Sequence, residues 1–107
     1  MPKPGEVVIL DFPGATGVKR RPAVVVSSDI YHSHRPDVVV GVVTSNLADA
    51  STPTDYVLQD WSAAGVRIPS AFRAYFVTTL PIATRRIGQL SARDWDAVRD
   101  RVRTALG

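Results

Sequence analysis

Six short apolar runs, separated by segments rich in turn-forming residues, are spread over the first ninety residues of the chain. Runs of this length and pattern predict β-strands rather than helices. They cover residues 6–12, 23–27, 38–43, 55–58, 71–78 and 87–90. The second and third runs are almost entirely valine, which indicates strands buried on both faces. Gly41 within the third run indicates a bend or the close approach of another backbone. The polar stretch 29–37 has room for one helical turn.

Only the C-terminal segment has the apolar spacing of a helix. Ser91 is a favourable N-cap and Asp94 stands three residues later, which is close to a capping box. Beyond it, apolar side chains recur at helical spacing and form one stripe, made of Trp95, Val98, Val102, Ala105 and Leu106. Short strands followed by one amphipathic helix predict a mainly β fold. We expect a small, strongly bent antiparallel barrel, closed on one side by the C-terminal α-helix.

The composition is that of one ordinary globular domain, covering residues 1–107. The chain has no cysteine, which excludes disulfides, thiolate catalysis and cysteine-ligated metals. No apolar run is long enough to span a bilayer, and the N-terminus lacks the apolar region of a signal peptide. We therefore expect a cytoplasmic protein without membrane contact. Arginine supplies most of the thirteen cations, and the net charge of +3 is a weak indication of an acidic partner such as nucleic acid.

Three cations, Lys19, Arg20 and Arg21, stand directly before Pro22. Proline fixes its own φ and biases the preceding residue toward an extended backbone. We therefore expect a loop to deliver Arg21 to the mouth of a buried strand. There it could bind a phosphate or stabilise developing negative charge. The alternative is a solvated basic loop, which is the commoner fate of such a tripeptide.

Two further pairs of residues lie at or within the predicted strands. Thr44 and Ser45 follow the third strand, where their hydroxyls could bind a phosphate oxygen or a ribose 2′-OH. The alternative for this pair is a turn that ends the strand. In the fifth strand, alternation places Arg73 and Tyr75 on one face. They could bind a phosphate and stack a base, or form an ordinary cross-strand contact.

Candidates for proton transfer are few. Asp11, near the end of the first strand, could orient an arginine or start a turn. His32 and His34 could act as general acid or base, since imidazole titrates near neutral pH. No third metal ligand with convincing spacing accompanies the two histidines. Surface imidazoles are therefore the favoured interpretation.

Three stretches together resemble the MazF/PemK family of toxins from bacterial toxin–antitoxin systems. Residues 5–13 are similar to the opening strand of that family, residues 20–27 to its RPAVVxS strand, and residues 42–45 to its VxTS strand end. The predicted C-terminal helix falls where the family has one. The resemblance therefore runs over essentially the whole chain.

The resemblance implies an SH3-like barrel that forms homodimers and cleaves single-stranded RNA at short sequences, without a metal or other cofactor. The ribose 2′-OH attacks the adjacent phosphate, giving a 2′,3′-cyclic phosphate and a 5′-OH end. A cognate antitoxin, with which the toxin binds DNA, is expected to occupy the RNA groove with an acidic, partly disordered segment. The resemblance assigns catalysis to Arg21 and Thr44. Residues expected to support RNA binding are Ser45, Arg20, Lys19, Arg73, Tyr75 and Asp11.

The chain also departs from the family. Many relatives carry an acidic residue on the fifth strand, where Tyr75 stands here, and a glutamate before the arginine–proline pair, which residues 14–19 lack. The general base therefore stays open among Asp11, a histidine, water and an arginine. Two alternative functions follow. One is a catalytically weak or inactive member that binds RNA or protein, and the other is a gyrase-directed toxin, against which the arginine–proline and threonine–serine motifs argue.

Overall fold

A computed structural model describes residues 2–15 and 17–107 of the chain. In chain order the elements of these residues are β1 (Glu6–Gly14), β2 (Gly17–Val25), α1 (Asp29–His34), β3 (Val38–Thr44), η1 (Leu47–Asp49), β4 (Tyr56–Val57), β5 (Ala71–Thr79), η2 (Pro81–Ala83), β6 (Arg85–Gln89) and α2 (Ala92–Leu106), where η marks a short 3₁₀ helix. Each predicted strand and the predicted C-terminal helix is present. The helical turn expected within 29–37 is α1.

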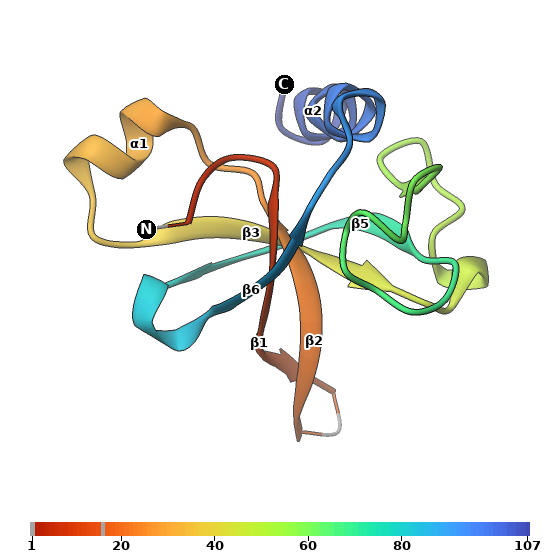
Figure 1. Cartoon of the computed structure of the whole chain (residues 1–107), viewed down its shortest axis with the longest axis horizontal. Helices are drawn as coiled ribbons and strands as arrows, with labels where there is room; N and C mark the ends of the chain where they lie inside the picture. The colour runs from red at the N-terminus through yellow and green to blue at the C-terminus, as the bar shows by residue number, and fades with distance from the viewer. Residues whose placement is uncertain (1, 16) are drawn as a thin grey trace.

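The strands form one antiparallel sheet in the order β4-β5-β3-β2-β1-β6. The sheet is strongly curled, with α2 lying over one side of it and the β1–β2 hairpin projecting away from α2 (Figure 1). This arrangement confirms the mainly β, helix-closed antiparallel barrel that the pattern predicts. Across the described residues, no helix combines the length and apolar content needed to cross a membrane.

The largest difference from the predicted elements lies in β2, which begins at Gly17 rather than at residue 23. The expectation that a loop carries the basic tripeptide is wrong, because this segment pairs in register with β1. Phe12 lies opposite Lys19, and Leu10 lies opposite Arg21. Lysine and proline are depleted from strands, so the local sequence around Lys19 and Pro22 favours a loop. Pairing with β1, whose inner side chains are buried, makes the segment a strand.

Two hydrophobic clusters pack on opposite faces of the sheet. One of them includes a residue of α2 and consists of Val7, Val24, Val43, Leu58, Ala64, Phe72, Leu90 and Val98. The other uses the opposite faces of β1, β2 and β3 and consists of Val8, Leu10, Phe12, Ala23, Val25, Val38, Val40 and Val42. Consecutive valines of β2 and β3 therefore point into different clusters. This confirms the predicted burial of these strands on both faces.

Gly41 in β3 marks a close approach, as predicted, but chiefly to a side chain rather than to a backbone. A Cβ at this position would lie 2.5 Å from Phe72 Cε1, so a larger residue would collide with the ring. The register of β3 against β5 also shifts between Gly41 and Val43, where two steps along β3 oppose four along β5. The shift comes directly before Thr44, the last residue of the strand.

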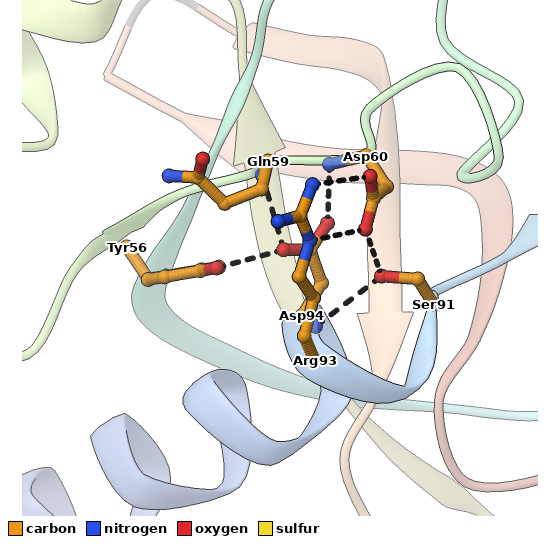
Figure 2. Close-up of polar contacts among 6 residues, drawn as sticks. All are labelled: Tyr56, Gln59, Asp60, Ser91, Arg93 and Asp94. Carbon is orange, nitrogen blue, oxygen red and sulfur yellow. Dashed lines mark hydrogen bonds and ion pairs between the residues drawn. The ribbon is translucent and has the colours of Figure 1, made fainter.

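The carboxylate of Asp94 anchors the start of α2 to the connection that follows β4 (Figure 2). Ser91 caps the helix as predicted, since its hydroxyl accepts a hydrogen bond from the Asp94 N–H at 3.3 Å. The Asp94 side chain is fully buried. It accepts hydrogen bonds from the Tyr56 hydroxyl at 2.7 Å, the Gln59 N–H at 3.0 Å and the Asp60 N–H at 2.8 Å. Burial, and next the hydrogen bond to Asp94, raises the pKa of Tyr56 to about 12.

Asp60 extends this network toward solvent (Figure 2). Its carboxylate accepts two hydrogen bonds from the Arg93 guanidinium, each 2.7 Å long, and one from the Ser91 hydroxyl at 2.6 Å. The hydrogen bonds from Arg93, and next that from Ser91, lower the pKa of Asp60 from 3.8 to about 2. The folded state therefore favours the charged form of this carboxyl group.

We expect stability to depend on Asp60 in acid. A carboxyl group with a lowered pKa in the folded state stabilises the fold above its unfolded-state pKa, and that contribution is lost as the pH falls through about 2. The difference in urea midpoint between wild type and Asp60→Asn should therefore be constant near neutral pH and shrink from about pH 4 to about pH 2. Urea unfolding monitored by circular dichroism measures it. A difference that stays constant down to pH 2 would contradict the prediction.

Candidate active site

A pocket of about 160 Å³ opens where the β1–β2 hairpin meets the end of β3 and the start of β5. Its apolar wall consists of Phe12, Pro13, Ala15 and Val42. Its polar lining consists of Lys19, Arg21, Thr44, Asp49, Arg73 and Tyr75. All of these polar residues except Asp49 are site residues that the sequence predicts. The fold therefore gathers most of the predicted set in one place.

Strand alternation explains why these side chains converge. Lys19 and Arg21 are two residues apart in β2 and share a face, and the same holds for Arg73 and Tyr75 in β5. Phe72, on the opposite face of β5, is buried in the cluster that includes α2. The predicted common face of Arg73 and Tyr75 is thus confirmed. Because β3 lies between β2 and β5, side chains on this face of the three strands meet.

Three cationic side chains make the pocket strongly positive. Arg21 and Arg73 bring guanidinium groups from two different strands, and Lys19 adds an ammonium group. Among the ion pairs of the described residues, none involves these three. Arginine stays charged at any ordinary pH and presents a planar fork of donors that matches a phosphate. The pocket is therefore suited to an anion with several oxygens.

Thr44 is held in place by the turn that ends β3. Its side chain is 8% exposed, and its Oγ1 accepts a hydrogen bond from the Asn46 N–H at 3.1 Å. This is the strand-ending turn that the sequence leaves as an alternative, and it coexists with a position in the pocket wall. Because the oxygen already accepts from the backbone, the hydroxyl hydrogen remains available to a ligand in the pocket.

Tyr75 connects β5 to the tip of the hairpin. Its hydroxyl donates to the Pro13 carbonyl at 2.9 Å, and its ring meets the edge of Phe12 with centroids 5.8 Å apart. The side chain nevertheless stays 43% exposed at the pocket. Tyr75 therefore holds the hairpin against the strands that carry Thr44 and Arg73, while leaving ring surface accessible.

Three of the predicted residues do not join the pocket. Asp11 and Arg20 lie opposite each other in the hairpin, with Oδ1 and Nη1 3.5 Å apart, and their side chains point to the other face of the sheet. Asp11 therefore orients Arg20 and not Arg21. Ser45 and Arg20 instead border a second cavity of about 400 Å³, which Arg21 also borders. The predicted set is thus divided between two faces.

The histidines lie at the opposite end of β3 from Thr44, because α1 precedes that strand (Figure 1). The His32 ring lies 2.5 Å from Ser27 Oγ, and Nδ1 of His34 lies 3.0 Å from the Ile30 carbonyl oxygen. Both imidazoles therefore make local contacts around α1, away from the pocket.

Asp49, the last residue of η1, is the polar residue of the pocket that the sequence does not single out. It lies in a loop of small residues without a recognisable motif. The Asn46 side-chain amide donates to Asp49 Oδ2 at 3.0 Å. The spacing of Asn46 and Asp49 is a local signal for this contact. Only the tertiary fold brings Asp49 to the pocket that Arg21 and Arg73 also line.

The curled sheet, its covering helix and the basic pocket define a small β-barrel protein with a candidate anion-binding site. The family model of the PemK-like, MazF-like toxins of type II toxin–antitoxin systems matches residues 3–106, and this chain belongs to that family. The resemblance carried by its motifs is therefore confirmed. No curated protein matches the chain in sequence.

Solved structures of MazF proteins share the fold. An endoribonuclease from Mycobacterial species, in complex with its cognate antitoxin, aligns with a TM-score of 0.79 at 19% identity, over 100% of this chain and 96% of that chain. MazF in a MazE–MazF structure from Deinococcus radiodurans aligns with a TM-score of 0.73 at 22% identity, over 99% and 96% of the two chains. A MazF toxin of Mycobacterium tuberculosis aligns with a TM-score of 0.69 at 20% identity, over 91% and 93%.

Proposed function

We propose that this chain is an endoribonuclease toxin that cleaves single-stranded RNA without a metal ion. The observation that carries the proposal is the convergence of Arg21, Thr44 and Arg73, from three neighbouring strands, on one pocket. Two guanidinium groups and a hydroxyl hydrogen are donors suited to the non-bridging oxygens of a phosphodiester. Membership of the PemK/MazF toxin family supports the same activity.

In the proposed reaction the ribose O2′ attacks the adjacent phosphorus, the O2′–P bond forms and the P–O5′ bond breaks. The products are a 2′,3′-cyclic phosphate and a 5′-OH end. Negative charge concentrates on the non-bridging oxygens as the transition state develops, so Arg21 stabilises that state more than the ground state. The Thr44 hydroxyl donates to one of these oxygens, and Arg73 supplies the second cation.

The pocket also fits the single-stranded form of the substrate. Unpaired bases can turn outward and stack on an aromatic ring, which bases within a duplex do not do. Tyr75 offers an exposed ring beside the cations, and we assign it to stacking a base next to the scissile phosphate. Lys19 adds electrostatic attraction for the backbone, which makes binding dependent on salt.

We also propose that the chain forms a homodimer and is neutralised by a cognate antitoxin. The similar Mycobacterial endoribonuclease was solved with its cognate antitoxin, and the similar Deinococcus radiodurans protein in a MazE–MazF structure. The net charge of +3 favours an acidic antitoxin segment, which would order on binding. Analytical ultracentrifugation should give twice the 11.6 kDa mass of one chain.

Incubation of the purified protein with a long single-stranded RNA in EDTA tests the proposed function. We expect fragments with 5′-OH and 2′,3′-cyclic phosphate ends, and no cleavage of an RNA with a 2′-deoxy residue at the cut site. If RNA binds but stays intact at high protein concentration, the chain is a binding member of the family and the proposed cleavage is wrong. If RNA does not bind, inhibition of DNA supercoiling by gyrase tests the remaining alternative.

A further inference from the structure

The pocket contains a carboxylate that the motifs of the chain do not indicate. Among the described residues of its lining, Asp49 is the acidic one, facing a wall that also carries Lys19, Arg21 and Arg73. The cleavage proposed above needs a base to take the proton of the 2′-OH. The β5 residues of the pocket, Arg73 and Tyr75, bring no carboxylate, so a carboxylate base must come from another element.

Asp49 is connected to Thr44 through Asn46. The Asn46 N–H donates to Thr44 Oγ1 at 3.1 Å, and its side-chain amide donates to Asp49 Oδ2 at 3.0 Å. The Asp49 N–H in turn donates to the Asn46 carbonyl at 3.0 Å, which closes the single turn of η1. Hydrogen bonds among the described residues use Oδ2 of this carboxylate and leave Oδ1 available to a ligand.

The other carboxylate and imidazole candidates lie elsewhere. Asp11 points to the opposite face of the sheet, where it pairs with Arg20. His32 and His34 lie around α1, beyond the far end of β3. Of the carboxylates and imidazoles considered for proton transfer, Asp49 alone shares a cavity with Arg21 and Thr44 in the part of the chain that the structure describes.

We propose that Asp49 is the general base of the cleavage reaction, an inference that rests on the proposed endoribonuclease function. Asp49 Oδ1 accepts the proton of the 2′-OH as the O2′–P bond forms. The P–O5′ bond breaks, and O5′ leaves as a hydroxyl after taking a proton from solvent water. Asp49 then returns its proton to solvent. The cationic side chains of the pocket offset the repulsion between this carboxylate and the phosphate.

Single-turnover cleavage of RNA by Asp49→Asn and Asp49→Ala tests the inference. A general base contributes about 10²–10⁴-fold, so we expect each variant to cleave at least about 100-fold more slowly than wild type. Affinity for an RNA with a 2′-deoxy residue at the cut site should change little, and so should the thermal midpoint. Asp100→Asn, which changes an exposed carboxylate on α2, is the matched control and should cleave like wild type.

Chemical rescue separates a base from a structural residue. Formate should restore part of the activity of Asp49→Ala, because a small carboxylate can enter the space left by the side chain. It should not restore Arg21→Ala, which lacks a phosphate ligand. If wild type cleaves while Asp49→Asn stays within about threefold of it, the assignment of Asp49 is overturned and the endoribonuclease stands. Loss of cleavage without formate rescue also overturns it, and absence of cleavage by wild type overturns the proposed function itself.

Discussion

Replacing Arg21 by alanine is expected to slow RNA cleavage about 10²–10³-fold, the effect of removing one preorganised donor to transition-state charge. Arg21 comes from a paired strand and lies in the same pocket as Thr44 and Arg73. The loss should appear in the single-turnover rate at saturating enzyme, because the interaction strengthens as charge develops on the phosphate. Arg21→Lys should recover only part of the rate, since an ammonium group cannot form the planar two-pronged contact.

Arg20→Ala provides the contrast within the same strand. Arg20 differs from Arg21 by one position and points to the other face, where it pairs with Asp11. We expect this variant to weaken RNA binding modestly and to lower its salt dependence, with the rate of the bound complex preserved. Arg103→Ala, on the exposed side of α2, controls for the loss of one positive charge. Equal rate losses in Arg20→Ala and Arg21→Ala would contradict the division of the hairpin into two faces.

Asp94→Ala is expected to destabilise the fold by about 3–5 kcal/mol, because three partly buried hydrogen bonds to one buried carboxylate are lost at once. Their donors are the hydroxyl of Tyr56 and the backbone N–H groups of Gln59 and Asp60. In a domain of this size such a loss lowers the thermal midpoint by more than about 10 °C. Differential scanning calorimetry and urea unfolding at neutral pH measure it.

Two matched variants test whether the loss of stability in Asp94→Ala comes from the hydrogen bonds to its carboxylate. Tyr56→Phe removes one donor and leaves the carboxylate with its two backbone partners, so we expect a loss of about 1 kcal/mol. Asp100→Ala, an exposed position of the same helix, should change stability by no more than about 0.5 kcal/mol. If Asp94→Ala unfolds at the same urea concentration as Asp100→Ala, the buried carboxylate does not anchor α2.

The local sequence pattern predicts the structure correctly wherever residues close along the chain determine it. Ser91 caps α2 because its side chain and the Asp94 N–H are three residues apart. The valines of β3 are buried on both faces because an apolar run has no polar side to expose. Arg73 and Tyr75 share a face because the side-chain period of a strand is two. These features predict the fold class and part of the pocket.

The local sequence pattern does not predict the structure where contacts with residues distant in sequence determine it. The local sequence of the basic tripeptide predicts a loop. In the structure the tripeptide pairs with β1, and this pairing directs Arg21 into the pocket and Arg20 away from it. The carboxylate of Asp94 is the expected acidic residue near a helix start, yet its acceptors serve donors more than thirty residues earlier. Neither outcome depends on residues close enough in sequence to reveal it.

By itself, the sequence determined that this protein is a small antiparallel barrel closed by one helix. It could do so because apolar periodicity, helix capping and strand alternation act over a few residues. The resemblance of its motifs to the toxin family, and not these patterns, led to the assignment of Arg21 and Thr44 to catalysis, which stays a prediction. Only the tertiary structure decided which cations share the pocket, that Tyr75 holds the hairpin through Pro13, and that Asp49 brings a carboxylate into the pocket that Arg21 lines. Register between distant strands sets these positions, since a shift of one residue exchanges the two faces of a strand.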